Sequence, residues 1–220
     1  MPEFNAAVQV SLKSTADGLH AEFDEIHTPE RVDAVLADSV EQISKDSKVE
    51  SFVPALAGRL ARERLRALAQ SAGTLEKSVP EVLFLGLHDS GRGQMAAALM
   101  RALGGDRVNV SSAATGAFEE IDPVVRAAME EIGVPFGDAY SKPLTQELLD
   151  AADVVVTMGR SVGSVTIPES ARHIDWRVGD PGGASIYEVR LIRDDIANRV
   201  RLLIAEIAPL TVVPVGAPTA

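Results

Sequence analysis

The segment that most constrains the fold is residues 81–103, which read EVLFLGLHDSGRGQMAAALMRAL. Residues 82–85 form a continuous apolar run, which is typical of a buried strand. A short glycine-containing loop follows, and the next residues repeat apolar side chains at helical spacing. A strand that passes through a tight loop into a helix presents main-chain N–H groups and the positive end of the helix dipole to an anion. This segment therefore predicts an oxyanion-binding loop.

The alternation of strand-like and helix-like segments continues along the chain. Further strands are expected within residues 107–113, 153–159 and 170–176, and helices within residues 93–103, 122–133, 145–152 and 184–207. Strands that alternate with helices favour a parallel sheet with helices on both faces. We therefore expect an α/β domain with four parallel strands over residues 80–210.

Residues 1–75 follow a different pattern, with apolar residues at helical spacing and no strand-like run. Thr28 and Pro29 suit the N-cap and the first turn of a second helix. A third helix is expected from near Pro54 to near Gly73. Three short amphipathic helices predict a three-helix bundle. Residues 76–79 are then a linker, and the Pro/Gly/Ala-rich residues 211–220 are expected to be a disordered tail.

The chain has no cysteine among its 220 residues and a formal net charge of −11. Disulfides, thiolate-bound metals and cysteine catalysis are therefore excluded. His20, His27 and His173 show no metal-ligand spacing, so neither a metal nor another cofactor is expected. The acidic balance makes nucleic acid and anionic membranes poor partners. With no recognisable signal peptide and no apolar run near 18 residues, a cytoplasmic protein is expected.

Four sequence segments occur in an informative order: GLHDSGRGQMAAA from residue 86, SSAATG at 111–116, ADVVVTMG at 152–159 and DWRVGDPGG at 175–183. With these segments, residues 80 to about 208 resemble the low-molecular-weight tyrosine phosphatase family, and within it the arsenate reductases. Some of those reductases carry a helical N-terminal extension, which residues 1–75 resemble. The resemblance implies the phosphatase fold for the α/β domain.

The resemblance also assigns roles to positions. In the family, a loop cysteine attacks phosphate or arsenate as a thiolate, an arginine grips the oxyanion, and an aspartate before proline protonates the leaving oxygen. Gly86 stands at the cysteine position, Arg92 at the arginine position and Asp180 at the aspartate position. The anion-binding candidates that follow are Leu87, His88, Asp89, Ser90, Gly91 and Arg92.

Several further positions depart from the family pattern together. Gly93 replaces a serine, Asp89 replaces a loop asparagine, and Arg160 stands where the reductases place another cysteine. The sequence therefore indicates a pseudoenzyme, an arsenate reductase-like protein without its thiol nucleophile and relay cysteines. We expect it to bind a phosphate, arsenate or sulfate-like oxyanion, or a protein partner. We also expect it to form a homodimer through the bundle.

Alternatives stay open at this point. The chain could be an enzyme with cysteine-free chemistry, using Asp89 or Ser90 as nucleophile or a water activated by Asp180. It could also be a regulator whose bundle binds DNA or protein, because four arginines lie on the predicted third helix: Arg59, Arg62, Arg64 and Arg66. The Asp89 carboxylate either repels an anion or pairs with Arg92 and fills the loop itself. His88 is expected to support the loop, and Asp180 to cap the turn before Pro181.

Overall fold

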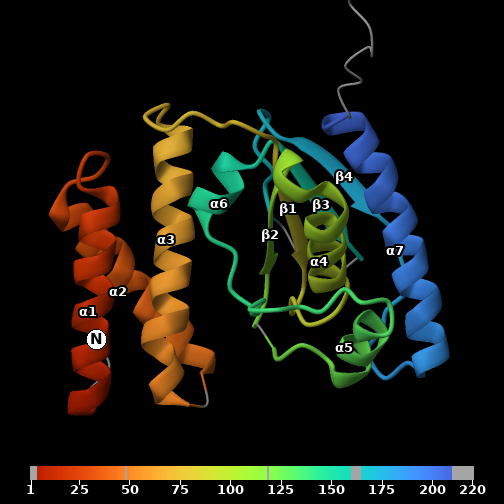
Figure 1. Ribbon diagram of the computed structural model, residues 1–220, viewed down its shortest axis with the longest axis horizontal. Helices are drawn as coiled ribbons and strands as arrows, with labels where there is room; N and C mark the ends of the chain where they lie inside the picture. Colours follow the sequence, from red (N-terminus) through yellow and green to blue (C-terminus); the bar gives the residue numbers. More distant parts are fainter. Residues whose placement is uncertain (1–3, 48, 118, 160–164, 210–220) are drawn as a thin grey trace, which may run out of the picture.

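The computed structural model describes residues 4–47, 49–117, 119–159 and 165–209 (Figure 1). Arg160 and the predicted tail at 211–220 lie outside these residues. The helices are α1 (Ala6–Phe23), α2 (Pro29–Asp46), α3 (Val53–Ser71), α4 (Arg92–Gly104), α5 (Pro123–Glu130), α6 (Gln146–Ala151) and α7 (Ile186–Ile207), with short 3-10 turns η1 (Glu50–Phe52) and η2 (Gly105–Arg107). The strands are β1 (Glu81–Gly86), β2 (Asn109–Ala114), β3 (Val154–Met158) and β4 (Arg172–Trp176).

The strands form one parallel sheet in the order β2-β1-β3-β4, so the predicted four-stranded α/β fold is confirmed. One boundary differs from the sequence prediction. Strand β2 begins two residues later than expected, because Gly105 adopts a φ of 55° and residues 105–107 form a 3-10 turn. Left-handed backbone of this kind is accessible to glycine at little cost.

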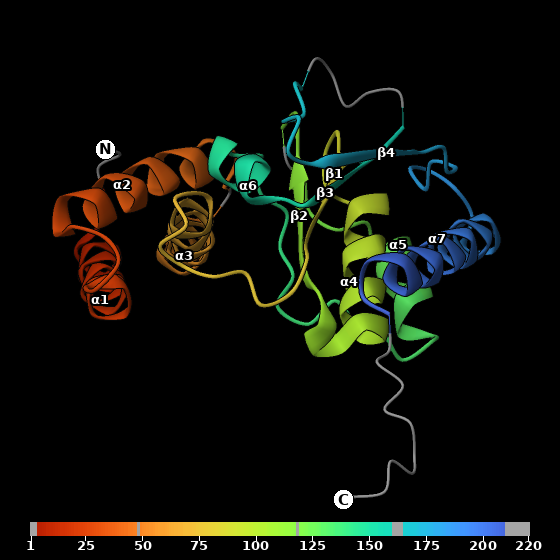
Figure 2. The same ribbon diagram turned by 90° about the horizontal axis from the view of Figure 1, so that it is seen from above.

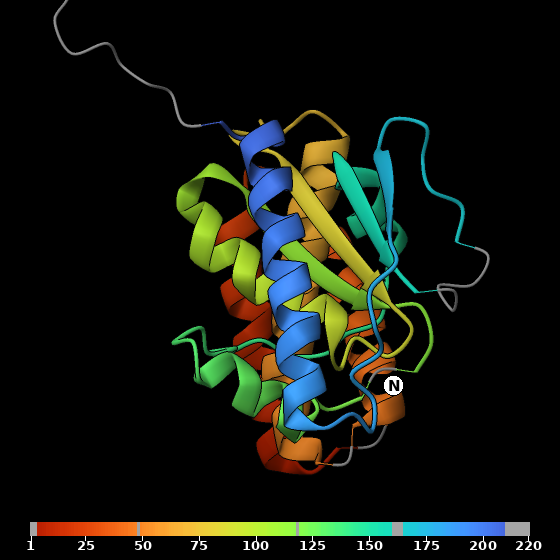
Figure 3. The same ribbon diagram turned by 90° about the vertical axis from the view of Figure 1, so that its right-hand side faces the viewer.

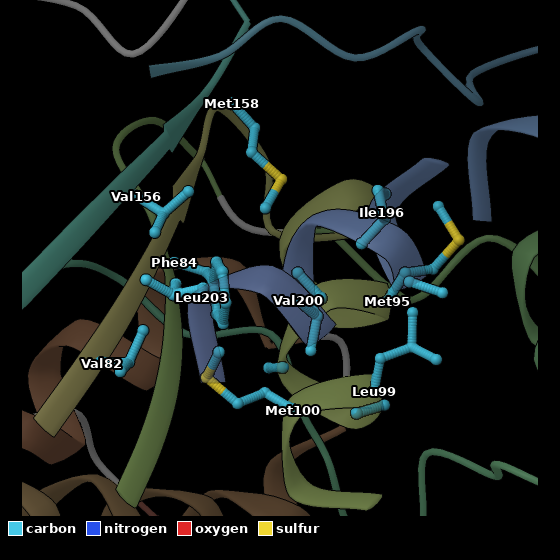
Figure 4. Close-up of a cluster of buried hydrophobic side chains, with 14 of the residues drawn as sticks. Val82, Phe84, Met95, Leu99, Met100, Val156, Met158, Ile196, Val200 and Leu203 are labelled. Atoms are coloured by element: carbon cyan, nitrogen blue, oxygen red, sulfur yellow. The ribbon is translucent and has the colours of Figure 1, made fainter. Parts of the chain in front are cut away.

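The sheet buries side chains on both faces. Val82 and Phe84 of β1 point toward α4 and α7, where they join Met95 and Val200 in the main core (Figure 4). The alternate residues of β1, such as Leu83, point to the other face and pack against a smaller cluster. Successive strand residues face opposite sides, so the continuous apolar run 82–85 of β1 needs a cover on each face of the sheet. Figure 3 shows α7 running across one of these covered faces.

The predicted three-helix bundle is also confirmed, and its second helix begins as expected. The Thr28 side chain accepts a hydrogen bond from the main chain of Arg31, and Pro29 occupies the first turn. The bundle has its own core, which includes Leu19, Ile43 and further buried residues of the three helices. It is therefore a packed unit with side chains interdigitating between α1, α2 and α3.

The bundle lies against the α/β domain through α3, beside β2 and α6 (Figures 1 and 2). Arg64 of α3 is 6% exposed and binds two carboxylates at once. Its Nη1 lies 2.6 Å from Asp38 of the bundle, and its Nη2 lies 2.7 Å from Glu147 of α6. A buried guanidinium with two acidic partners ties the two parts of the chain together.

Most of the α3 arginines that suggested DNA binding contact other residues of this chain instead of pointing freely into solvent. Arg59 donates to the main-chain carbonyl of Asp138, and Arg62 pairs with Glu22 at 2.6 Å. Together with Arg64, three of the four arginines are engaged within the chain. Only Arg66 makes no hydrogen bond or ion pair with another described residue.

The Arg64 contact gives a first prediction. We expect Arg64→Ala to lower the free energy of unfolding by about 3 kcal/mol, because it leaves Glu147 partly buried without its cation. Arg62→Ala is the matched control, since the Arg62–Glu22 pair is close to half exposed and is expected to be worth about 0–1 kcal/mol. Urea unfolding of both variants measures the difference. Equal losses in the two variants would contradict a special role for Arg64.

Candidate functional site

The loop between β1 and α4, residues 86–92, lies at the carboxyl end of the sheet. Strand β1 lies between β2 and β3 in the sheet. The chain goes from β1 to β2 on one side and then crosses to β3 on the other side, so the strand order reverses at β1. Ligands of open parallel sheets bind outside the carboxyl ends of strands at such a reversal. The fold therefore places the predicted anion loop where this class of fold binds its ligands.

The loop carbonyls face outward and are all engaged. Thr115 N donates to Gly86 O, Gly116 N to Leu87 O, Glu119 N to His88 O, and Asp122 N to Ser90 O, at 2.9–3.1 Å. In a trans peptide the next N–H points opposite to the carbonyl. The N–H groups of residues 87, 88, 89 and 91 are therefore directed to the inside of the turn.

These inward N–H groups have no acceptor from the chain. Within the described residues, no main-chain N–H of residues 87–92 donates a hydrogen bond. Helix α4 then begins at Arg92 with its first-turn N–H groups and its dipole directed at the same space. Unpaired donors that share one concavity form a site for an oxyanion.

Arg92 reaches the same end of the sheet and is held there by two neighbours. Its Nη2 lies 3.2 Å from Asp180 Oδ2, with the Arg92 side chain 15% exposed. Its guanidinium passes so close to Gly159 that a Cβ on that residue would lie 2.9 Å from Nη1. Gly159 also has a φ of +87°, so glycine is required there both for conformation and for space.

Asp180 has the structural role that was expected and a second one. Its Oδ1 accepts a hydrogen bond from Gly182 N at 3.1 Å, which closes the turn around Pro181. Its other oxygen pairs with Arg92. Of the two alternatives left open for Asp89, its pairing with Arg92 is not what the structure shows, because Asp180 is the carboxylate at the guanidinium.

Asp89 points into the protein instead. It is 2% exposed, and its Oδ2 accepts hydrogen bonds from Gln94 Nε2 at 2.9 Å and from Ser112 Oγ at 3.2 Å. Its Oδ1 has no hydrogen-bond partner of good geometry. Asp89 also has a φ of 50°, a left-handed conformation that Asn and Asp tolerate better than most residues. The side chain lies under the start of α4, where a Cβ on Gly93 would be 3.0 Å from Oδ1.

Burial raises the pKa of Asp89 to about 7. The charge of Lys142 and the hydrogen bonds from Ser112 and Gln94 act in the opposite direction and offset this only in part. Desolvation disfavours the charged form of a carboxyl group, so an acid placed here resists ionisation until neutral pH. The loop therefore rests on a carboxyl group that changes charge close to pH 7.

The remaining loop residues make contacts that support the loop. His88 Nδ1 lies 3.0 Å from the carbonyl oxygen of Ala117, as a structural role predicts. The Ser141 hydroxyl donates toward the main-chain oxygens of His88 and Asp89. The Ser90 side chain makes no hydrogen bond with a described residue, and no histidine or lysine base is paired with it.

The glycines at 86 and 91 differ in what they do. A Cβ at Gly86 would meet only Asp89 N at 3.9 Å, which is ordinary contact. A Cβ at Gly91 would lie 2.7 Å from Pro181 Cγ, so this glycine allows the Asp180–Pro181 segment to pack on the loop. Of these two positions, only position 91 must be glycine for the packing to fit. A small side chain would fit at position 86.

The sequence did not predict the residues around the Asp89 carboxyl group. Lys142 is 4% exposed, Gln94 1% and Ser112 1%, and they come from three separate segments. Lys142 precedes a proline, which indicates extended backbone but not burial. The pattern of polar residues gave no signal that these side chains would meet.

Two further classes of site find no support. Among the described residues, no three His, Asp or Glu side chains are grouped so as to hold a metal ion. Of the helices that the structure describes, none combines the length and the apolar character needed to cross a bilayer.

The glycine geometry gives a second prediction. We expect Gly86→Ala to leave the free energy of unfolding unchanged or to raise it by up to about 1 kcal/mol, because the new methyl has room and the unfolded chain loses freedom. Gly91→Ala is expected to lower it by about 1–3 kcal/mol, since its methyl overlaps Pro181. Denaturant unfolding compares the pair. A larger loss at Gly86 than at Gly91 would show that the loop is packed differently.

Asp89 gives a third prediction, on pH. Between about pH 4 and pH 7 the unfolded chain releases this proton while the folded chain keeps it. The folded state therefore binds more protons, and stability falls as pH rises through this window, by up to about 4 kcal/mol. We expect Asp89→Asn to be more stable than the parent protein at pH 8 and to lose most of this advantage near pH 4. Asn also tolerates the positive φ.

Unfolding free energies at pH 4.5, 6 and 8 measure this effect. The exposed Asp17→Asn is the control, and its difference from the parent is expected to stay constant over the same range. A pH-independent difference for Asp89→Asn would mean that the Asp89 carboxyl group does not titrate near neutrality.

The chain is similar to known proteins over both of its parts. Residues 81–210 match the family described as low molecular weight phosphotyrosine protein phosphatase, and residues 12–69 match the protein-tyrosine-phosphatase-like N-terminal domain. An arsenate reductase of Brevibacillus brevis is 32% identical over 122 residues, which are 54% of this chain and 90% of that protein. A glutaredoxin arsenate reductase of Synechocystis is 29% identical over 131 residues, 58% of this chain and 98% of that protein.

Solved structures agree with this relationship. The thioredoxin-dependent arsenate reductase of Corynebacterium glutamicum has a TM-score of 0.80 and 32% identity, and the match covers 89% of this chain and 96% of that one. A structure described as an arsenate reductase in the phosphate binding state has a TM-score of 0.53 and 29% identity, covering 59% of this chain and 99% of that one. Over residues 81–210, from β1 to the end of α7, this chain belongs to the low molecular weight phosphotyrosine protein phosphatase family and resembles the arsenate reductases within it.

Proposed function

We propose that this chain is a non-catalytic member of its family that binds a phosphate- or arsenate-like oxyanion in the loop of residues 86–92. The proposal rests on two features of this loop that occur together: a missing nucleophile and a retained set of anion-binding groups. The position that holds the family's nucleophile is Gly86, which has no side chain, while the inward N–H groups and Arg92 keep the arrangement that binds an anion. A solved relative described as being in the phosphate binding state supports this choice of ligand.

Cysteine-free catalysis by a loop side chain finds less support. The Asp89 carboxyl group is 2% exposed and is bound by Gln94 and Ser112, so it is directed away from the inward N–H groups. Ser90 has no base beside it among the described residues. A nucleophile needs both access to the ligand and a group that activates it.

Charge decides how tightly the loop binds. Arg92, the N–H groups and the dipole of α4 attract an anion, and Asp180 competes for Arg92. Ionised Asp89 adds repulsion that the protein interior screens less well than water does. Because the pKa of Asp89 is raised to about 7, the repulsion from this group is weaker below neutral pH than above it.

Calorimetric titration with inorganic phosphate tests the proposal. We expect one site per chain, and we expect Arg92→Ala to weaken binding by about 10–100-fold, the value of a charge-assisted hydrogen bond. Asp180→Asn and Asp89→Asn are expected to strengthen binding at pH 8, because each removes a negative charge near the ion. The absence of any phosphate binding, both in the parent and in Asp89→Asn, would refute the proposal.

A turnover assay separates binding from catalysis. The parent protein is expected to show no hydrolysis of p-nitrophenyl phosphate and no reduction of arsenate with thiol reductants. Turnover that disappears in Arg92→Ala would show that the loop performs cysteine-free chemistry, and the non-catalytic assignment would then be wrong.

We further propose that the protein is a cytoplasmic homodimer joined through the N-terminal bundle. The exposed apolar side chains Val10 (71%) and Phe52 (61%) on this part of the chain support such a contact.

A further inference from the structure

A cavity separate from the loop lies between the N-terminal bundle and the α/β domain. Its volume is about 360 Å³, and it is lined by residues of α3, α4, β2 and the segment 136–142. Figures 1 and 2 show β2 between α3 and α4. None of residues 86–92 lines it. Cavities of this size are large enough for a small metabolite.

The charges that line the cavity are not balanced. Three are cationic, Arg59, Arg101 and Lys142, and two are anionic, Glu63 and Asp138, which leaves one positive charge in excess. Lys142 is neutralised by Glu63, with Nζ 2.8 Å from Oε2. Arg59 donates to the main-chain carbonyl of Asp138, not to its carboxylate. The Arg101 side chain lines the cavity and forms no hydrogen bond or ion pair with another described residue. Two guanidinium groups therefore lack a carboxylate.

The open edge of β2 adds main-chain hydrogen-bonding groups. Asn109 and Thr115 donate toward the β1 side, to Pro80 and Gly86. Ala114, by contrast, pairs with residues 142 and 144 on the outer side. Because the direction alternates along a strand, the N–H and C=O groups of residues 110 and 112 also face outward. Both of these residues line the cavity, so main-chain donors and acceptors that have no partner among the described residues are directed into it.

Gln94 provides a buried acceptor at the same cavity. Its side chain is 1% exposed. Its Nε2 donates two hydrogen bonds, one to Asp89 Oδ2 at 2.9 Å and one to the main-chain oxygen of Tyr140 at 3.0 Å. Its Oε1 has no hydrogen-bond partner among the described residues. A buried amide oxygen without a donor costs free energy unless a ligand or solvent supplies one.

We propose that this cavity binds a small organic anion that carries a carboxylate or phosphate group on a hydroxylated body. Arg101 and Arg59 bind the anionic group. The hydroxyl groups donate to Gln94 Oε1 and to the open edge of β2. Phe136 and Ala139, which also line the cavity, pack against the carbon skeleton. This binding site goes beyond the proposed function of the loop and does not depend on it.

The test uses the full-length Arg92→Ala protein, so that an anion bound in the loop does not contribute. Two probes represent the two anionic groups: citrate for hydroxylated carboxylates and glycerol 3-phosphate for phosphate monoesters. Calorimetry and thermal shift then follow binding. Arg101→Gln is the main variant, because Arg101 makes no contact that the fold needs. Arg201→Gln is the matched control, since Arg201 is an exposed arginine whose side chain bonds Asn198 on its own helix.

We expect at least one probe to bind with one site per chain. We expect Arg101→Gln to weaken that binding about tenfold or more, and Arg59→Gln to weaken it as well, while Arg201→Gln leaves it unchanged. The proposal is overturned if neither probe binds at 10 mM, or if Arg101→Gln and Arg201→Gln bind it equally well. Titration of inorganic phosphate into Arg101→Gln with Arg92 intact reports on the loop separately, so failure of one site is not read as failure of the other.

Discussion

The outward hydrogen bonding of the 86–92 loop is the constraint on which the rest of the site depends. Four loop carbonyls are bonded to residues 115–122, so the peptide planes are fixed from outside the loop. No part of this framework uses the side chain at position 86. The loop can therefore keep its shape in a chain with no cysteine, because main-chain geometry and packing maintain it.

Two replacements beside the loop fit together physically. The Asp89 carboxyl group lies where a Cβ at position 93 would be 3.0 Å from Oδ1, and position 93 is glycine. A serine there, as the family pattern has, would crowd the carboxyl group. The acid is buried under α4 at the cost of a raised pKa, with Lys142 as the nearest compensating charge. The space beneath the loop therefore holds a carboxyl group whose pKa is raised to about 7 by burial.

Much of this architecture could be predicted from the sequence. Apolar runs and helical periodicity identified the four strands and seven α-helices found in the part of the chain that the structure describes, because these signals are local. The candidate positions Gly86, Arg92 and Asp180 followed from the resemblance of four sequence segments to the family. The direction of the Asp89 side chain could not be predicted, since it depends on Gln94, Ser112 and Lys142, which come from distant segments. The pairing of Asp180 with Arg92 could not be predicted either, because it also joins segments that are far apart in the sequence.

The contact between the bundle and the α/β domain brings these features together. Glu63 of α3 pairs with Lys142, Lys142 stabilises the charge of Asp89, and Asp89 holds Gln94. Arg64 adds a second link from α3 to Glu147. The bundle therefore supplies an acid, Glu63, that balances the charge of Lys142 beside the buried carboxyl group of Asp89. If α3 moved away, Lys142 would lose Glu63 and interact more strongly with Asp89, so the position of the bundle and the charge beneath the loop are physically coupled.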